Sequence, residues 1–281
     1  MTVLELTALV AGGSFAAGLL GALTGLGGGV VIVPLLVLGF GIDLRYAAGA
    51  SLVSVIATSS GAAASYVKEG YSNVRVGMFL EMATTLGAVA GAGLTAVLPT
   101  GAVADVFGVV LLASAAFAGR ERGDVPTAAL EPPPDRLATR LRLGGTEPTP
   151  AGPRPYVARR VSLGFALMAV AGLLSGLLGI GSGALKVLAM DRAMGLPFKV
   201  STATSNFMIG VTAAASAGVY LRRGYLDPGL TLPVMLGVLA GSFLGARLLP
   251  RLGTPVLRLL FAAVIAALGV QMILHGLTGR L

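Results

Sequence analysis

The sequence feature that most constrains this chain is a glycine-rich interruption that occurs twice within apolar sequence. The first copy is Gly25-Leu26-Gly27-Gly28-Gly29, and the second, Gly179-Ile180-Gly181-Ser182-Gly183, lies 154 positions later. Aligning residues 17–94 with residues 171–248 without a gap matches about 20 of 78 positions, so the chain contains an internal repeat. Two related halves, each with an interrupted apolar segment at the same place, are typical of transporters that bind their substrate where the halves meet.

The composition places the chain in a lipid bilayer. Hydrophobic residues make up 55% of the 281 residues, charged residues make up 11%, and the mean hydropathy is +0.89, whereas soluble domains carry about 25% charged residues. The chain has no cysteine and one histidine, His275, so we expect no thiol chemistry, no resident metal and no cofactor. The net charge of +8 comes from basic residues scattered over connections, without a nucleic-acid-binding motif, and we expect no nucleic-acid partner.

Four apolar runs in each half are long enough to matter in a membrane, where a crossing helix needs about 20 residues. They fall near residues 3–39, 47–67, 74–98, 101–118, 160–190, 199–221, 229–249 and 254–277. The sequence therefore predicts an all-α polytopic membrane protein with one membrane repeat over residues 1–118 and a homologous one over residues 159–281. In each repeat a glycine-broken first segment precedes three transmembrane helices.

The first run of each half is too long for one helix, and two topologies are consistent with it. If each run crosses the membrane once, the two halves are parallel. If each run folds back at its glycines, the halves are inverted, and basic residues such as Arg192 and Arg251 lie on the cytoplasmic side. The excess of Lys and Arg in cytoplasmic loops favours inverted repeats.

Residues 119–158 connect the halves and are rich in proline and arginine. Such a composition cannot bury enough apolar area to offset the entropy of ordering the chain. We therefore expect a flexible cytoplasmic linker with little regular structure and no active site.

The motifs follow the order found in a known family. The run from Gly25 to Pro34, followed by Ala48-Gly49-Ala50-Ser51-Leu52, Tyr66 and Gly70, resembles the TauE/SafE family of membrane transporters, also called the sulfite exporter family. The second half repeats this likeness, which covers nearly everything outside the linker. The resemblance implies a multi-pass carrier in the cell inner membrane for sulfite, sulfonates or other small sulfur-containing anions.

A helix that begins just after a glycine loop presents unpaired backbone N–H groups and a partial positive charge at its start, and both favour an anion. Each half contains one such start. The candidate anion-binding positions are Gly27, Gly28, Gly29, Gly181, Ser182 and Gly183. A close crossing of helices through small residues is the alternative explanation of these glycines.

Lys186 and Leu188 stand where the family generally has an apolar residue and a proline, and Ser182 replaces a usual glycine. Lys186 lies one turn past the second break, and helical side chains lean towards the N-terminus, so its ammonium group can reach back to the anion. A lone cation in apolar sequence indicates a functional role. Snorkelling of Lys186 to the interface near Asp191 and Arg192 is the alternative.

Small polar side chains on the next helix of each half can donate hydrogen bonds to an oxyanion. The candidates are Ser51 and Thr58 in the first half, and Ser205 and Asn206 in the second. Hydrogen bonds to a carbonyl group of the same helix or of a neighbouring helix are the alternative for each hydroxyl group.

Glu81 is the one acidic residue well inside a predicted span, and it is the candidate for proton coupling. An ion pair with Lys186 or a contact with Arg75 is the alternative for this carboxylate. The repeated tyrosines Tyr66 and Tyr220 are expected to anchor helix ends at the lipid headgroups rather than to bind a ligand.

The sequence thus favours a transporter that moves a small anion by alternating access and that neither makes nor breaks a bond. We expect no enzyme, because the chain has no nucleophile elbow, no His-Glu-x-x-His motif and no paired acids. An anion channel with the same glycine-lined site is the main competing hypothesis, and a purely structural membrane scaffold is another.

Overall fold

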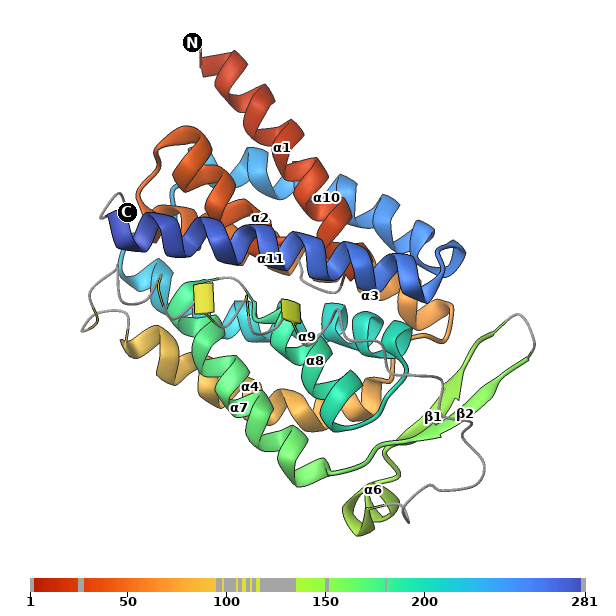
Figure 1. Ribbon diagram of the computed structural model, residues 1–281. Helices are drawn as coiled ribbons and strands as arrows, with labels where there is room; N and C mark the ends of the chain where they lie inside the picture. The colour runs from red at the N-terminus through yellow and green to blue at the C-terminus, as the bar shows by residue number, and fades with distance from the viewer. Residues whose placement is uncertain are drawn as a thin grey trace.

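Each glycine-rich interruption separates two helices, as the sequence predicts. The computed structural model describes residues 3–24, 28–94, 98, 105, 108–109, 112, 115–116, 135–149, 152–179 and 181–278. Helix α1 (Val3–Thr24) is followed by α2 (Gly29–Pro34), and α7 (Val161–Leu178) is followed by α8 (Gly183–Leu188). The helices of both halves pack into one bundle with a short β hairpin at one end (Figure 1).

The two halves share the same succession of elements. The first half continues with the π-helix η1 (Leu35–Gly39), α3 (Leu44–Lys68) and α4 (Val74–Leu94), and the second half continues with the π-helix η2 (Ala189–Ala193), α9 (Phe198–Arg222) and α10 (Pro228–Leu248). Each element of the first set recurs 154 positions later with the same length. The second half ends with η3 (Leu249–Arg251) and α11 (Thr254–Thr278). The structure therefore confirms the duplication that the alignment of the halves indicates.

Hydrogen bonds of the two repeated tyrosines recur in the same way. The hydroxyl group of Tyr66 donates to the carbonyl oxygen of Ala22 at 2.9 Å, and that of Tyr220 donates to the carbonyl oxygen of Gly176 at 3.5 Å. Both tyrosines are buried. The prediction that they anchor helix ends at the headgroups is therefore wrong: their hydroxyl groups satisfy carbonyl groups in the last turn of α1 and α7, which lack partners within the helix.

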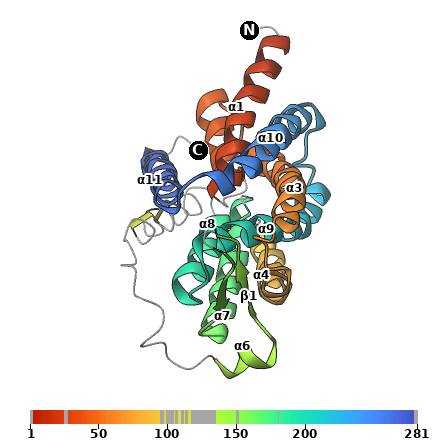
Figure 2. The ribbon, with the colours of Figure 1, turned by 90° about the vertical axis from the view of Figure 1, so that its right-hand side faces the viewer.

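In the bundle, helices of one half pack against helices of the other half. The first helix of each half packs along the last repeated helix of the other half, α1 along α10 and α7 along α4. Glycines allow these helices to approach closely. A Cβ atom on Gly91 would overlap the carbonyl oxygen of Leu173, and one on the repeat mate Gly245 would crowd that of Leu19. The helices thus form two lobes (Figure 2). The first lobe consists of α1, α2, α3 and α10, and the second lobe consists of α7, α8, α9 and α4. The two lobes meet where α3 packs against α9.

The chain reverses direction at each break, so that the short helix runs back along the long one. In the first half, Leu35 of η1 lies against Gly13 of α1. In the second half, the N–H group of Arg159, just before α7, donates to the carbonyl oxygen of Met194, just after η2, at 2.8 Å. The π-helix forms in both halves, so the replacement of Pro34 by Leu188 at the matching position does not alter the fold.

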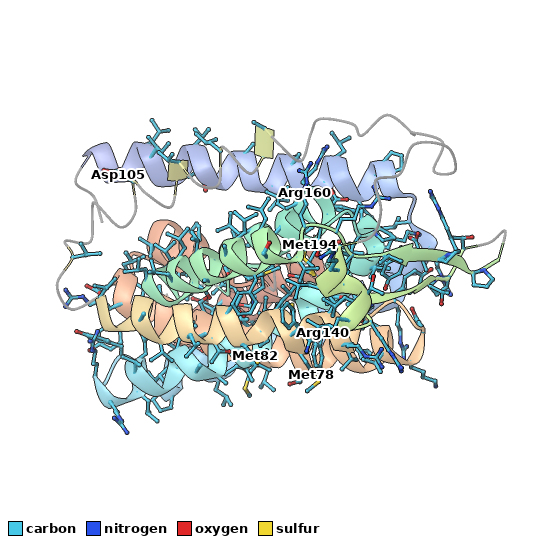
Figure 3. The ribbon with its side chains drawn as sticks, turned by 90° about the horizontal axis from the view of Figure 1, so that it is seen from below. Met78, Met82, Asp105, Arg140, Arg160 and Met194 are labelled. Atoms are coloured by element: carbon cyan, nitrogen blue, oxygen red, sulfur yellow. The ribbon has the colours of Figure 1, made fainter. Side chains whose placement is uncertain are left out.

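Within the part of the chain that the structure describes, four helices are long and apolar enough to cross a membrane, namely α3, α4, α7 and α10. Helices α1 and α11 contain shorter apolar stretches. Met78 and Met82 lie on the outer side of α4 and are 63% and 55% exposed, as expected of side chains that face lipid (Figure 3). The predicted run 101–118 lies largely outside the described residues, but Gly108 within it packs against Gly269 of α11.

The connection between the halves contains regular structure, so the expectation of little order in residues 119–158 is wrong for residues 135–149 and 152–157. This part forms α6 (Arg136–Arg140) and an antiparallel hairpin of β1 (Gly144–Glu147) and β2 (Arg154–Val157). Asp135 explains part of the order, because its carboxylate accepts hydrogen bonds from the N–H groups of Leu137 at 3.0 Å and Val161 at 2.8 Å. It thereby caps α6 and ties it to the start of α7.

The membrane helices supply the apolar partner that the linker sequence lacks. Leu143 and Ala158, which flank the hairpin, are buried in one cluster with residues of α4 and α7. The side-chain amide of Asn73, before α4, donates to the carbonyl oxygen of Gly144 at 3.2 Å and to the hydroxyl oxygen of Tyr156 at 3.0 Å. Burial raises the pKa of the Glu147 carboxyl group at the end of β1, although the nearby Arg154 and Lys199 oppose this shift.

Candidate functional site

Two consecutive residues of α9 make hydrogen bonds near the breaks, one residue at each break. The hydroxyl group of Ser205 donates to the carbonyl oxygen of Gly183, at the second break, at 3.4 Å. The side-chain amide of Asn206 donates to the carbonyl oxygen of Ala22, at the end of α1 and next to the first break, at 3.0 Å. The breaks therefore lie around the middle of one helix, at the contact between the two lobes.

Several buried polar atoms at the second break and on α9 have no hydrogen-bond partner within the part of the chain that the structure describes. They are Ser182 Oγ, Ser201 Oγ, Thr202 Oγ1 and Asn206 Oδ1. Buried polar atoms are almost always paired with protein or with water. Such a group of unpaired atoms beside a helix start is suited to a polar ligand or to ordered water.

The backbone at both breaks adopts conformations that favour glycine. Gly28 has φ 73°, Gly179 has φ 68° and Gly181 has φ 78°. Ser182 has φ 48°, a left-handed conformation that is unfavourable for a residue with a side chain. The helices α2 and α8 then begin at Gly29 and Gly183 without a side-chain cap. In α2 the N–H group of Val31 bonds to the carbonyl oxygen of Gly28 at 3.0 Å, whereas the earlier N–H groups of a first turn have no acceptor within the helix.

The other predicted anion ligands are placed as follows. Gly27 lies outside the described residues. Gly28, Gly29, Gly181, Ser182 and Gly183 are all buried at the breaks. The hydroxyl group of Ser51 donates to the carbonyl oxygen of Gly29 at 3.3 Å, and that of Thr58 donates to the carbonyl oxygen of Ser54 at 2.9 Å. A role of Ser51 and Thr58 in binding an anion therefore requires their hydroxyl groups to give up these partners, and it stays a prediction.

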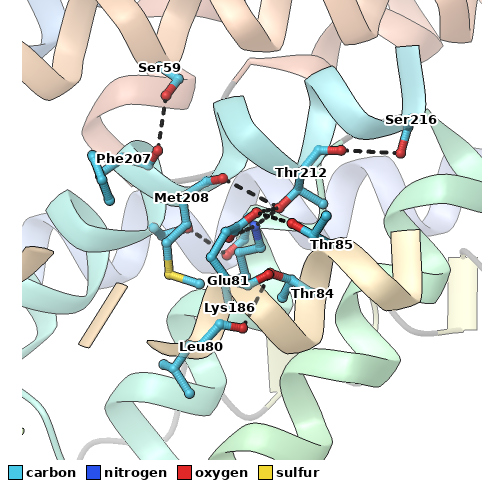
Figure 4. Close-up of polar contacts among 12 residues, drawn as sticks. Ser59, Leu80, Glu81, Thr84, Thr85, Lys186, Phe207, Met208, Thr212 and Ser216 are labelled. Atoms are coloured by element: carbon cyan, nitrogen blue, oxygen red, sulfur yellow. Dashed lines mark hydrogen bonds and ion pairs between the residues drawn. The ribbon is translucent and has the colours of Figure 1, made fainter. Parts of the chain in front are cut away.

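Lys186 and Glu81 form a buried ion pair between α8 and α4 (Figure 4). The ammonium nitrogen lies 3.3 Å from Glu81 Oε2, and the Lys186 side chain is fully buried. The hydroxyl group of Thr212, on α9, accepts a hydrogen bond from Lys186 and donates one to Glu81 Oε1. Thr85 donates to the same carboxylate oxygen at 3.2 Å. The contact between Glu81 and Lys186, one of the two alternatives for the carboxylate, is thus present, whereas snorkelling of Lys186 is excluded by its burial.

The sequence analysis did not single out Thr85 or Asn73. Thr85 follows Glu81 by four residues, the spacing at which side chains meet on one face of a helix, and this signal could have identified it. No comparable signal exists for Asn73, whose N–H group donates to Thr204 Oγ1 at 3.0 Å across 131 residues of chain. Among the described residues, no group of three or more acidic or histidine side chains is placed to hold a metal ion.

Comparison with known proteins agrees with this architecture. The model of the family described as sulfite exporter TauE/SafE matches residues 10–272. The chain is 27% identical over 269 residues to the probable membrane transporter protein YunE of Bacillus subtilis (strain 168), which covers 93% of this chain and 95% of that protein. It is 26% identical over 240 residues to the probable membrane transporter protein YdhB of the same organism, which covers 83% of this chain and 86% of that protein.

No solved structure matches the chain. The family match spans nearly the whole sequence, and it includes both breaks and the buried ion pair. The chain therefore belongs to the sulfite exporter TauE/SafE family, and it is a multi-pass membrane transporter rather than an enzyme.

Proposed function

We propose that this transporter moves sulfite, a sulfonate or a related small sulfur-containing anion across the cell inner membrane by alternating access. The description of the family as sulfite exporters supports the substrate class. The proposed ligands of the anion are Gly27, Gly28, Gly29, Ser51, Thr58, Gly181, Ser182, Gly183, Lys186, Ser205 and Asn206. Glu81 is the proposed site of proton coupling.

The observation that carries the proposal is the pair of hydrogen bonds that α9 makes to both breaks. Ser205 bonds to Gly183 and Asn206 bonds to Ala22, so the start of α8 and the end of α1, just before the first break, lie around one short stretch of α9. The hydroxyl group of Ser182, which can donate a hydrogen bond to an anion, is buried there without a partner in the described chain. An anion whose oxygens accept from the helix starts at the breaks and from Ser182 would satisfy groups that the protein alone leaves unpaired.

Inverted repeats suit such a site, because they place two equivalent helix starts near the middle of the membrane. Two features support inversion here. Each broken segment folds back on itself, as the contact of Arg159 with Met194 indicates. In addition, α1 descends from the N-terminus in Figure 1, whereas α7 rises from the β hairpin in the opposite direction.

Alternating access requires a closable contact on each side of the site, and the turns after α3 and α9 are the candidates. The turn after α3 contacts the start of α9, where Ser72 Oγ donates to the carbonyl oxygen of Ala203 at 3.3 Å. The turn after α9 contacts the start of α3, where a guanidinium nitrogen of Arg45 donates to the hydroxyl oxygen of Tyr225 at 3.2 Å. We propose that these two contacts open in turn.

Counterflow in proteoliposomes tests the proposal. The purified protein is reconstituted, the vesicles are loaded with unlabelled sulfite, and the uptake of a trace of labelled sulfite from outside is followed. A carrier accumulates the label transiently, because its binding site returns across the membrane faster with substrate bound than without it. A channel does not accumulate the label. Saturable counterflow is the expected result, and channel-like flux with continuous current would contradict alternating access.

Substitutions at the break locate the site. Ser182→Val is expected to lower sulfite flux by at least about tenfold, because it removes a hydroxyl group and places a branched side chain beside the helix start. Gly12→Ala is the matched control, since a Cβ atom at this position of α1 meets nothing within 4 Å. Wild-type flux through Ser182→Val would exclude the second break from the site.

A further inference from the structure

The ion pair of Lys186 and Glu81 has no counterpart in the other lobe. The position that matches Lys186 is Ile32, and the position that matches Glu81 is Met235. Ile32 is fully buried in the apolar cluster of its own lobe. The same backbone, with the same π-helix and the same packing of α1 on α10, thus forms around apolar side chains at both positions.

A buried ion pair is costly when apolar residues fit the same place. Removing two charges from water costs several kcal/mol per ion, and well-packed apolar residues are often as stabilising as the pair that they replace. The first lobe shows that this fold accommodates the apolar solution. The charges in the second lobe therefore point to a function in transport rather than to a requirement of the fold.

We propose, on the basis of the function proposed above, that the carboxylate of Glu81 occupies the place of the substrate in the empty transporter. A monovalent anion displaces it from the ammonium group of Lys186, and Glu81 takes up one proton from the solution as its partner is lost. Release of the anion reverses both steps. One anion therefore travels with one proton.

The charges define the class of substrate. In the empty site the single ammonium group of Lys186 balances one carboxylate. With Glu81 protonated, the same ammonium group balances one monoanion, such as hydrogen sulfite or an alkanesulfonate. A dianion such as sulfate would leave one uncompensated negative charge buried beside Lys186, which is strongly unfavourable. The site thus selects monoanionic sulfur oxyanions over dianions of similar size.

Thr212 is placed to assist the exchange as a positioning residue. Its hydroxyl group accepts from Lys186 and donates to Glu81 in the same arrangement, so it can transfer its donated bond to an oxygen of the incoming anion. The backbone N–H group of Lys186 bonds to the carbonyl oxygen of Ser182 at 3.1 Å. The unpaired hydroxyl group of Ser182 lies one helical turn before the ammonium-bearing residue, at the start of the same short helix.

Lys186 is the charged residue that contacts the Glu81 carboxylate, and the other charged groups on the surrounding elements lie elsewhere. Helix α7, which packs along α4, contains no charged residue, and α9 has its charged residues, Lys199 and Arg222, near its two ends. On α4 itself, Arg75 donates to the carbonyl oxygen of Arg142 of the linker. On the element after α8, Asp191 pairs with Arg192 at 3.6 Å.

The test uses the full chain in lipid nanodiscs and two tetrahedral probes of similar size, methanesulfonate as a monoanion and sulfate as a dianion. Calorimetric titration in two buffers with different ionisation enthalpies gives the number of protons taken up per anion bound. We expect about one proton per methanesulfonate, an affinity that falls about tenfold per pH unit wherever one proton is taken up with the anion, and sulfate binding at least about a hundredfold weaker.

Two variants separate the roles of the pair. Glu81→Gln keeps the shape and the hydrogen bonds of a protonated carboxyl group, so it is expected to bind methanesulfonate at least as tightly as the native chain, with no proton uptake and no dependence on pH. Lys186→Met is expected to weaken methanesulfonate binding by at least about tenfold. Ile32→Met, at the matching buried position of the first lobe, is the control and should leave binding and proton uptake unchanged.

Equal binding of sulfate and methanesulfonate, or an unchanged proton count in Glu81→Gln, would overturn the exchange. If sulfite still showed saturable counterflow in either case, the proposed function would stand without it. If neither probe bound and sulfite showed no counterflow, both the proposed function and the exchange would be wrong.

Discussion

The two lobes of this transporter share one backbone but not one chemistry. Elements of identical length recur 154 positions apart, and each lobe contains a broken helix, a π-helix and a close glycine crossing. Polar residues nevertheless gather in the second lobe, where Ser182, Lys186 and Asn206 replace Gly28, Ile32 and Leu52. The duplicated backbone therefore provides the scaffold, whereas the polar substitutions in one copy provide the candidate site.

The exchange of helices between the halves makes this division possible. Glu81 belongs to the first half of the sequence, but α4 packs along α7, so its carboxylate reaches Lys186 and Thr212 of the second half. Its own repeat mate, Met235, lies on α10 in the other lobe. The polar site of the second lobe is therefore assembled from residues of both halves of the sequence.

Breaking the charged pair in the second lobe should have the largest effect. Lys186→Ile copies the first-lobe residue but leaves Glu81 buried without its cation, and we expect a loss of about 3–5 kcal/mol of unfolding free energy. Thermal unfolding of the purified protein in detergent measures it. The double variant Glu81→Met with Lys186→Ile should recover most of this loss of stability. If the double variant is no more stable than Lys186→Ile alone, the two lobes are not equivalent scaffolds.

Crowding the glycine crossings should affect both lobes alike. Gly91→Val on α4 and its repeat mate Gly245→Val on α10 place a side chain against a backbone carbonyl group of the facing helix. Each is expected to cost about 1–3 kcal/mol of stability, the usual range for overpacking. Gly93→Ala is the control on α4, because a Cβ atom there meets nothing within 4 Å. A large difference between the two valine variants would contradict the equivalence of the crossings.

Replacing the amide that α9 presents to the first break should have a moderate effect. Asn206→Leu introduces the residue found at the matching position of α3 and removes the hydrogen bond to the carbonyl oxygen of Ala22. Because Tyr66 still donates to that oxygen, we expect a loss of about 1 kcal/mol of stability together with a marked loss of sulfite flux. Chemical denaturation and counterflow measure the two effects separately, and unchanged flux would remove Asn206 from the site.

The smallest effect is expected where Ser182 of the second break matches Gly28 of the first. Ser182→Gly removes the side chain from a residue with φ 48° and should stabilise the protein by about 1 kcal/mol, whereas Gly28→Ser adds a side chain to a residue with φ 73° and should destabilise it by a similar amount. The midpoints of thermal unfolding of both variants should therefore move in opposite directions. Shifts of the same sign would show that the breaks have different backbone requirements.

The sequence was sufficient to predict the repeat, the two breaks and the membrane class, because each depends on local residue types at a fixed spacing. It could not predict which helices pair. The spacing of the glycines on α4 predicts a close crossing, but nothing in it indicates that Gly91 meets Leu173 of the other half. The order in the linker was missed for the same reason, since the hairpin is held by contacts with Asn73 and with the membrane helices rather than by its own sequence.

The candidate site was predicted in part. Lys186 and Glu81 were identified because charged residues are rare in apolar sequence, but their mutual contact was one of two alternatives, since it depends on how α4 and α8 meet. Ser51 and Ser205 were identified as donors to an anion, and in the structure their hydroxyl groups donate to the carbonyl oxygens of Gly29 and Gly183. Sequence indicates that a hydroxyl group is present, whereas the nearest acceptor is decided by the fold.

The most direct test of the account is the sulfite flux of the double variant Glu81→Met with Lys186→Ile, which gives the second lobe the apolar pair of the first. The measurement uses proteoliposomes that contain folded protein, as judged by its thermal unfolding. We expect a stable protein without saturable sulfite counterflow. Wild-type counterflow through this variant would contradict the claim that the charged pair of the second lobe forms the transport site.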